Sequence, residues 1–183
     1  MVKAVEKVRQ RLLRATAALK AARIPYAVAG GNAVAAWVSS VDESAVRNTQ
    51  DVDILIRRED LDRVKTALEG AGFVYRRSAG LDIFLDGPGA KAREAVHIVF
   101  ALEKVRPHEP AANPDVTQSK DTGTFDILDL EALVRIKLTT SCDEDRKHLR
   151  DLISVGLVDD TWPARLLPEL ASRLQSLLDD PQG

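Results

Sequence analysis

The stretch Thr49-Gln-Asp-Val-Asp-Ile-Leu-Ile56 places two carboxylates, Asp51 and Asp53, inside an otherwise β-branched and apolar run. Side chains alternate across a strand, so both aspartates are expected on one face, with their backbones roughly 7 Å apart. Like charges on one sheet face repel and resist burial unless a cation lies between them. The pair therefore predicts a divalent metal held by oxygen ligands, which points to phosphate chemistry.

A glycine pair precedes this stretch. The short apolar run Tyr26-Ala-Val-Ala29 predicts a buried strand, Gly30-Gly31 ends it, and Asn32-Ala-Val-Ala-Ala-Trp-Val38 has the character of a helix. Glycines at such a junction let a phosphate approach the backbone, and the N–H groups that open the helix attract the anion. Gly30, Gly31 and Asn32 are therefore expected to hold the β- and γ-phosphates of a nucleotide. Taken alone, Gly-Gly is equally consistent with a tight strand-to-helix turn.

Composition limits the other possibilities. The chain has 183 residues, 45% of them hydrophobic, which suffices for one good core. Its formal charge of −2 excludes a polycation built for duplex binding. The single cysteine, Cys142, excludes an internal disulfide and a multi-cysteine zinc site. No apolar run approaches the length of a membrane span and the N-terminal segment is charged, so we expect a cytoplasmic protein without a membrane partner.

Hydrophobic periodicity, together with glycine and proline residues that end helices and strands, predicts the secondary-structure elements. Helices are predicted over 3–23, 32–38, 61–71, 129–138, 145–155 and 163–179, and strands over 26–29, 51–56, 73–85 and 95–101. We expect an α/β core over 1–103, an extended, proline-containing connection over 104–124, and a helical C-terminal region over 125–183 packed on the core.

This order of elements resembles the nucleotidyltransferase superfamily with the polymerase β-like fold. The resemblance implies an α/β (α+β) fold, with a short mixed sheet flanked by helices and a helical C-terminal region. Arg47 and Thr49 just before Asp51 make the chain most similar to the branch of AbiEii-type toxins and small bacterial nucleotidyltransferases. The resemblance is clear over 24–57 and looser to about residue 155, where Lys137 and the stretch 145–151 are similar to that branch's C-terminal helices.

The resemblance also implies an activity and its components. It implies Mg²⁺-dependent transfer of a nucleotidyl group from a nucleoside triphosphate (NTP) to a hydroxyl acceptor, with one or two Mg²⁺ ions as cofactor. The acceptor would be tRNA or another RNA, or a protein, and a cognate antitoxin or a second copy of the chain would be the partner. Asp51 and Asp53 are the predicted metal ligands and catalytic residues. The predicted nucleotide-binding residues are Gly30, Gly31, Asn32, Arg47, Thr49 and Lys137.

Several of these residues have a second interpretation. Arg47 can clamp a phosphate or be an ordinary surface residue. Lys137 lies on the apolar stripe of its helix and needs a negative partner, either a nucleotide phosphate or a carboxylate of the chain itself. Asp145 and His148 share the apolar stripe of the next helix, where they are expected to form hydrogen bonds between helices.

His97 departs from the superfamily pattern. Related proteins usually carry a third carboxylate on a later strand, as a base toward the acceptor hydroxyl or as part of a second metal site. Val96-His-Ile-Val-Phe100 has a histidine at that place. Either Asp82 in Leu81-Asp-Ile-Phe84 replaces the carboxylate, or His97 is catalytic as a neutral imidazole base, or the catalytic set is incomplete. In the last case the chain is a nucleotide-binding or interaction module.

The first predicted helix is basic. Its cationic residues outnumber the single acidic residue, Glu6, between positions 3 and 23; they are Lys3, Lys7, Arg9, Arg11, Arg14, Lys20 and Arg23. Such a face is expected either to contact an RNA backbone or an acidic protein, or to be a solvated helix surface.

Overall fold

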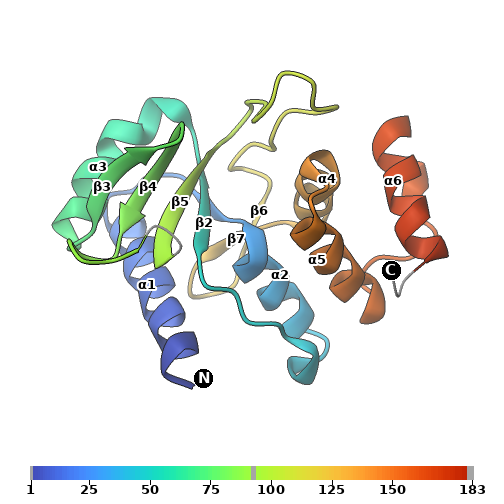
Figure 1. Cartoon of the computed structure of the whole chain (residues 1–183), viewed down its shortest axis with the longest axis horizontal. Helices are drawn as coiled ribbons and strands as arrows, with labels where there is room; N and C mark the ends of the chain where they lie inside the picture. The colour runs from blue at the N-terminus through green and yellow to red at the C-terminus, as the bar shows by residue number, and fades with distance from the viewer. Residues whose placement is uncertain (1, 92–93, 181–183) are drawn as a thin grey trace.

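The strand that carries Asp53 lies at the centre of the molecule. The computed structural model describes residues 2–91 and 94–180, in which seven strands form one mixed sheet of order β3-β4-β5-β2-β1-β7-β6 (Figure 1). The strands are β1 (Ala27–Val28), β2 (Val52–Ile56), β3 (Val74–Ser78), β4 (Leu81–Leu85), β5 (Ala95–Phe100), β6 (Ser119–Asp121) and β7 (Asp126–Leu128). All residues of β2 except Asp53 are buried, which explains its β-branched and apolar composition.

Six α-helices cover this sheet and extend beyond it: α1 (Val2–Ala21), α2 (Gly30–Ser39), α3 (Leu61–Gly70), α4 (Leu130–Thr140), α5 (Asp143–Ser154) and α6 (Pro168–Asp179). Short 3₁₀ turns lie at η1 (Glu43–Ala45), η2 (Arg58–Asp60) and η4 (Pro163–Arg165). Helices α1 and α3 pack together beside β3, β4 and β5, whereas α4, α5 and α6 gather on the other side, beyond α2 (Figure 1). The predicted α/β fold with a short mixed sheet and a helical C-terminal region is confirmed.

The register of the sheet decides which side chains share a face. β2 pairs in parallel with β5, so Asp53 lies opposite His97, and β4 pairs antiparallel with β5, so Ile83 lies opposite His97. Directly paired residues project to the same face, and the next residue along each strand projects to the other. Asp53 and His97 therefore share one face, and Asp82 lies on the opposite face.

Three predicted segments differ from the observed elements. The helix expected from residue 32 begins two residues earlier, at Gly30. The strand character over 73–85 belongs to a hairpin, β3 and β4, whose turn residues Ala79 and Gly80 both have positive φ. Pro168 marks the first turn of α6 and does not kink a longer helix, since proline is tolerated at that position.

Two short strands, β6 at the edge of the sheet and β7 beside it, have no signal in the sequence. β6 lies within the segment predicted to be an extended connection, 104–124, and β7 follows it. Each spans only three residues, too short to show a period of two; β7 joins the sheet through its parallel pairing with β1. The boundaries of the three predicted regions stay a prediction.

The connection after β5 is attached to the core by ion pairs. Arg57 donates two hydrogen bonds to the Asp115 carboxylate, at 3.0 and 2.8 Å, and Arg58 pairs with Glu103 while its guanidinium stacks over Phe100. The Arg57 guanidinium holds the pKa of the Asp115 carboxyl well below its usual range. These contacts hold the connection against the end of β2.

The basic character of α1 is partly structural. Arg11 is 3% exposed, donates to the backbone carbonyl of Gln50 at 2.9 Å and pairs with Asp86 at 3.3 Å. Arg14 pairs with the same carboxylate and stacks over Phe73. The prediction of a locally uncompensated basic face is therefore wrong at these two positions. Within the described residues, no helix has both the length and the apolar character needed to cross a membrane.

We predict that Arg11 stabilises the fold, in contrast to Arg9 on the same helix. Arg11→Glu removes the buried one of the two cationic partners of Asp86 and puts a second carboxylate beside it, and losing one partner of a buried ion pair costs about 3–5 kcal/mol. Since Asp86 is partly exposed, we expect the lower end of that range, about 3 kcal/mol, in the free energy of unfolding measured with urea.

Arg9→Glu is the matched control because Arg9 is exposed, so its free energy of unfolding should change by less than about 0.5 kcal/mol. Equal stability of the two variants would contradict the structural role of Arg11.

Candidate functional site

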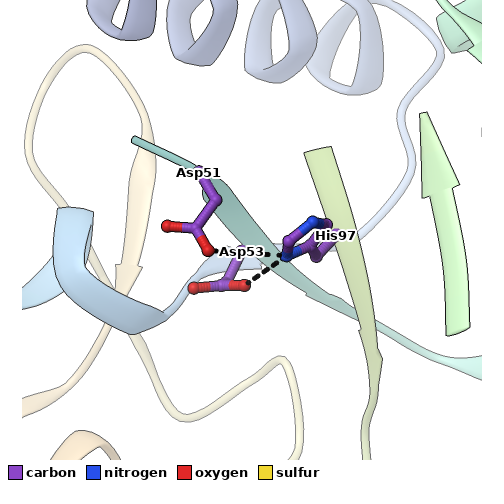
Figure 2. Close-up of side chains that lie close together, drawn as sticks. All are labelled: Asp51, Asp53 and His97. Carbon is purple, nitrogen blue, oxygen red and sulfur yellow. Dashed lines mark ion pairs between the residues drawn. The ribbon is translucent and has the colours of Figure 1, made fainter. Parts of the chain in front are cut away.

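Two carboxylates and one imidazole meet at the centre of the sheet. Asp51 directly precedes β2, Asp53 is its second residue, and His97 lies opposite Asp53 on β5. His97 Nδ1 is 3.6 Å from Asp51 Oδ2 and 3.5 Å from Asp53 Oδ1, and one ligand atom from each residue lies within 4.8 Å of the other two (Figure 2). The side chains of Asp51, Asp53 and His97 are 37%, 25% and 26% exposed, so the group is open to solvent.

Hydrogen bonds from neighbouring segments fix the two aspartates. Thr49 Oγ1 donates to Asp51 Oδ1 at 2.8 Å, and Asn32 Nδ2 donates to the backbone carbonyl of Asp51 at 2.7 Å. The backbone N–H of Ala29 donates to the carbonyl of Asp53 at 2.8 Å. The start of α2 is thereby held against the strand that carries the carboxylates.

The glycine pair allows the start of α2 to lie close to the segment that carries Thr49 and Asp53. Gly30 has φ +58°, and a Cβ atom there would lie 1.8 Å from Asp53 Oδ2, so a side chain is sterically excluded. A Cβ at Gly31 would lie 3.0 Å from the Thr49 side chain and 3.3 Å from His148 Nε2. Ala29 at the N-cap has no side-chain acceptor for the first N–H groups of α2, which favour an anion at this end.

The opposite wall comes from α4 and α5. Lys137 Nζ lies 2.7 Å from Asp145 Oδ1, with both side chains buried. In this structure the negative partner of Lys137 is therefore a carboxylate of the chain itself. Asp145 also accepts from the backbone N–H of Cys142 at 3.4 Å and from its Sγ at 3.0 Å, which caps α5. Asp145 thus forms the interhelical contact expected of it.

His148 on α5 faces the glycine pair. Burial and the nearby Lys137 lower its pKa, so the neutral imidazole is favoured. Its Nδ1 is buried and has no hydrogen-bond partner among the described residues, and its Nε2 points toward Gly31. His148 was expected to bond between helices; the sequence offered no signal that it would face the start of α2, because that proximity depends on how α5 packs.

Two cavities of about 210 Å³ each adjoin these residues and share Asp53, Lys137 and Asp145. One is polar and its other lining residues are Gly31, Asp51, Cys142, Glu144 and His148. The second is bordered by Gly30 and by apolar side chains, and its other lining residues are Ala29, Val99, Val105, Asn113, Ile136 and Thr140. Together they form a cleft with one end suited to phosphate and metal and the other to a less polar group.

Five predicted residues do not line the two cavities. Asn32, Thr49 and His97 contact Asp51 or Asp53 from beside them, whereas Arg47 and Asp82 are occupied elsewhere. The Nε of Arg47 donates to Asp151 Oδ1 of α5 at 2.8 Å. Asp82 is buried on the opposite face of the sheet, where its carboxylate accepts a 2.5 Å hydrogen bond from the Tyr75 hydroxyl and raises that group's pKa. The interpretation of Asp82 as the replacement carboxylate is therefore wrong. The predicted residues other than Arg47 and Asp82 lie together; they are Gly30, Gly31, Asn32, Thr49, Asp51, Asp53, His97 and Lys137.

Solved structures of similar architecture include a nucleotidyltransferase-like protein and an antibiotic-resistance factor. An antigenic nucleotidyltransferase-like protein of Paracoccidioides brasiliensis superposes with a TM-score of 0.62 at 18% identity, over 96% of this chain and 89% of that one. The antibiotic-resistance factor ANT(2'')-Ia gives a TM-score of 0.58 at 14% identity, over 92% and 91% of the two chains. Its complex with adenylyl-2''-tobramycin gives 0.57 at 15% identity, over 89% and 94%. These likenesses concern the fold.

The sequence itself is more specific about the family. No curated protein matches it significantly. The family of uncharacterised nucleotidyltransferases matches residues 2–139, a segment that holds the glycine pair, both aspartates, His97 and Lys137. Because that match spans most of the chain, the protein belongs to the uncharacterised nucleotidyltransferase family, within the nucleotidyltransferase superfamily.

Proposed function

We propose that this protein binds a nucleoside triphosphate together with a divalent metal and transfers the nucleotidyl group to a hydroxyl acceptor. The observation that carries the proposal is the contact between Asp53 and the first residue of α2, which is close enough to exclude any side chain at Gly30. It brings a carboxylate pair that suits a cation against a helix start that suits an anion. A metal–triphosphate complex satisfies both.

Each residue of the cleft has a task in this proposal. Asp51 and Asp53 would hold the divalent metal, and Thr49 orients the Asp51 carboxylate. The backbone N–H groups at Gly30, Gly31 and Asn32 bind phosphate oxygens, and Lys137 exchanges Asp145 for a phosphate. When bound, the metal neutralises the triphosphate and stabilises charge on the attacking and leaving oxygens. The apolar end beside Val99 and Ile136 receives the nucleoside or the acceptor.

His97 has two roles open to it at the observed distances. A neutral imidazole can accept the proton of the acceptor hydroxyl, or its nitrogen lone pair can complete the metal site. Arg47 has a secondary part in either case: through Asp151 it holds the segment before β2 against α5.

The finer resemblance to the AbiEii-type branch is part of this proposal. It is supported by Arg47 and Thr49 before Asp51 and by Lys137 facing the site from α4, and it implies a cytoplasmic protein with an RNA or protein acceptor and a cognate antitoxin or a second copy as partner. The adenylyl-2''-tobramycin bound in the ANT(2'')-Ia structure supports a different acceptor, a small hydroxyl compound. An assay with all three acceptor classes separates them.

A second candidate function is nucleotide binding without turnover. It is favoured by His97 itself, the third side chain beside the aspartates in the described structure. An imidazole in place of the third carboxylate of related proteins leaves the site with one negative charge fewer to hold cations. Such a protein would bind the nucleotide as a sensor or an interaction module.

We predict that the two aspartates are required for metal-dependent nucleotide binding. Removing one carboxylate weakens the ligand set for a hard cation that keeps most of its waters, so Asp51→Asn and Asp53→Asn should each abolish the Mg²⁺-dependent part of triphosphate affinity in calorimetric titrations. The fold should persist, because both side chains are partly exposed. Asp82→Asn is the control and should bind normally, since the amide oxygen can still accept from Tyr75. Unaltered binding by either site variant would contradict the metal site.

The close contact between Gly30 and the Asp53 side chain gives a second prediction. Gly30→Ala requires a left-handed backbone for a residue with a side chain, at a cost of about 1–2 kcal/mol, and its Cβ displaces Asp53. We expect lower stability and a loss of metal affinity of roughly tenfold or more. Gly70→Ala is the matched control, because a Cβ there meets nothing within 4 Å in the described structure. Equal metal affinity of the two variants would show that Asp53 does not depend on Gly30.

Turnover distinguishes the two candidate functions. The full chain is incubated with Mg²⁺ or Mn²⁺, each of the four triphosphates, and an RNA, a protein or an aminoglycoside acceptor, and pyrophosphate release is measured. We expect release that depends on both metal and acceptor and that is lost in Asp53→Asn. Tight metal-dependent binding without release over the whole set would support the binding module instead.

A further inference from the structure

We propose that His97 is a protein ligand of the metal, through Nδ1, and that the site prefers a transition-metal dication that accepts nitrogen ligands over Mg²⁺. This inference rests on the proposed metal site at Asp51 and Asp53 and specifies its cofactor. It follows from the one residue in which the cluster departs from an all-oxygen set. Carboxylate oxygens suit both Mg²⁺ and Mn²⁺, but Mn²⁺ and the later first-row metals also accept an imidazole nitrogen, whereas Mg²⁺ is rarely given a nitrogen ligand.

The backbone brings the three donors together. Because β2 and β5 are parallel and in register, Asp53 and His97 project side by side from the same face, and Asp51 lies two residues before Asp53 on that face. The arrangement depends on central strands of the sheet, whose flanking residues Val52, Ile54 and Val96 are buried. A site on such strands is better defined in position than one built from loops.

The distances fit ligands of one ion. Metal–nitrogen and metal–oxygen bonds of about 2.0–2.2 Å at tetrahedral angles place neighbouring ligand atoms roughly 3.3–3.6 Å apart. The observed separations from His97 Nδ1, 3.5 and 3.6 Å, lie within that range. Figure 2 shows Nδ1 directed at both carboxylates, the orientation that a shared ion requires.

Charge favours one such ion. Two carboxylates and a neutral imidazole carry two negative charges, which a single dication balances. Without a metal, an unprotonated Nδ1 would turn its lone pair toward two anions, an unfavourable arrangement that either a proton or a metal relieves. A proton would make His97 a cationic partner of the aspartates and leave no place for the ion. Direct detection of the nitrogen ligand separates these two states.

Mn²⁺ alone is the probe, added to the full-length protein without nucleotide. We expect electron spin-echo spectroscopy to show a nitrogen-14 coupling of a directly bound imidazole, and we expect His97→Ala to lose it. The chain has three histidines, so two matched controls should keep the coupling: His108→Ala, exposed on the connection after β5, and His148→Ala, beside the glycine pair.

Competition tests the preference itself. Removing a group that only supports a metal ligand lowers metal affinity about 10–100-fold. Because His97 is proposed to be a ligand itself, we expect His97→Ala to lower the affinity for Mn²⁺ by at least about tenfold. His97→Asp should retain binding but shift the ratio of Mn²⁺ to Mg²⁺ affinity toward Mg²⁺ by roughly tenfold, because it restores an all-oxygen set. Circular dichroism confirms that each variant is folded. If His97→Ala does not fold, His97→Asp carries the test, since it too must abolish the nitrogen coupling.

Four results would overturn the inference: no Mn²⁺ binding by the wild type without nucleotide, bound Mn²⁺ without nitrogen coupling, a coupling that survives both His97 substitutions, or an affinity ratio that His97→Asp leaves unchanged. The proposed function fails on different grounds, namely metal and nucleotide binding that is indifferent to Asp51→Asn and Asp53→Asn. Normal Mg²⁺-dependent nucleotide binding by a protein without the nitrogen coupling would reject His97 as a ligand and leave the nucleotidyltransferase proposal standing.

Discussion

The close approach between Asp53 and the first residue of α2 is the constraint on which the rest of the site depends. The Ala29 N–H donates to the Asp53 carbonyl, and Gly30 turns the chain with a positive φ so that α2 starts beside the Asp53 carboxylate. In the proposed function the carboxylates would hold the metal and the helix start would bind the triphosphate, so each would supply what the other lacks. One backbone contact thus brings the cation and anion requirements of the proposed reaction to the same point.

The centre of the sheet gives that contact its rigidity. β2 is paired on both sides, by β1 and β5, and the side chains on its other face are fully buried, so the carboxylates project from the part of the structure least able to move. Holding two like charges in a half-buried place costs free energy, which burial of the apolar side chains around β2 offsets.

The C-terminal helices α4 and α5 contribute the side chains that form one wall of the cleft. Lys137 of α4 is neutralised by Asp145, which also caps α5, so the lysine that faces the cleft is tied to the start of the next helix. Transfer of Lys137 from Asp145 to a phosphate would therefore alter the cap of α5 as well as the cleft. His148, one turn further along α5, reaches the glycine pair from the same wall. Helices distant in sequence from the aspartates thus form the wall of the cleft that would receive the nucleotide in the proposed function.

The sequence by itself determined the elements that have a strong local pattern. The long helices and the strands β2, β4 and β5 follow from hydrophobic periodicity, and the Gly-Gly and Asp-x-Asp motifs follow from backbone and charge requirements that act within a few residues. The three-residue strands β6 and β7 lie below the length at which a period can be read. Their place was decided by pairing, of β7 with β1 and of β6 with β7. The start of α2 at Gly30 likewise depends on a turn that only the contact with Asp53 requires.

What only the tertiary structure decided is which side chains meet across the sheet. The pattern Leu81-Asp-Ile-Phe84 and the pattern Val96-His-Ile-Val99 are equally strand-like, so local sequence could not choose between Asp82 and His97 as the neighbour of the aspartates. The register of β4, β5 and β2 made the choice, because a shift of one residue moves a side chain to the opposite face. Lys137 found an internal carboxylate, and Arg47 paired with Asp151, for the same reason: long-range packing sets which opposite charges come within reach, and a linear sequence carries no record of those distances.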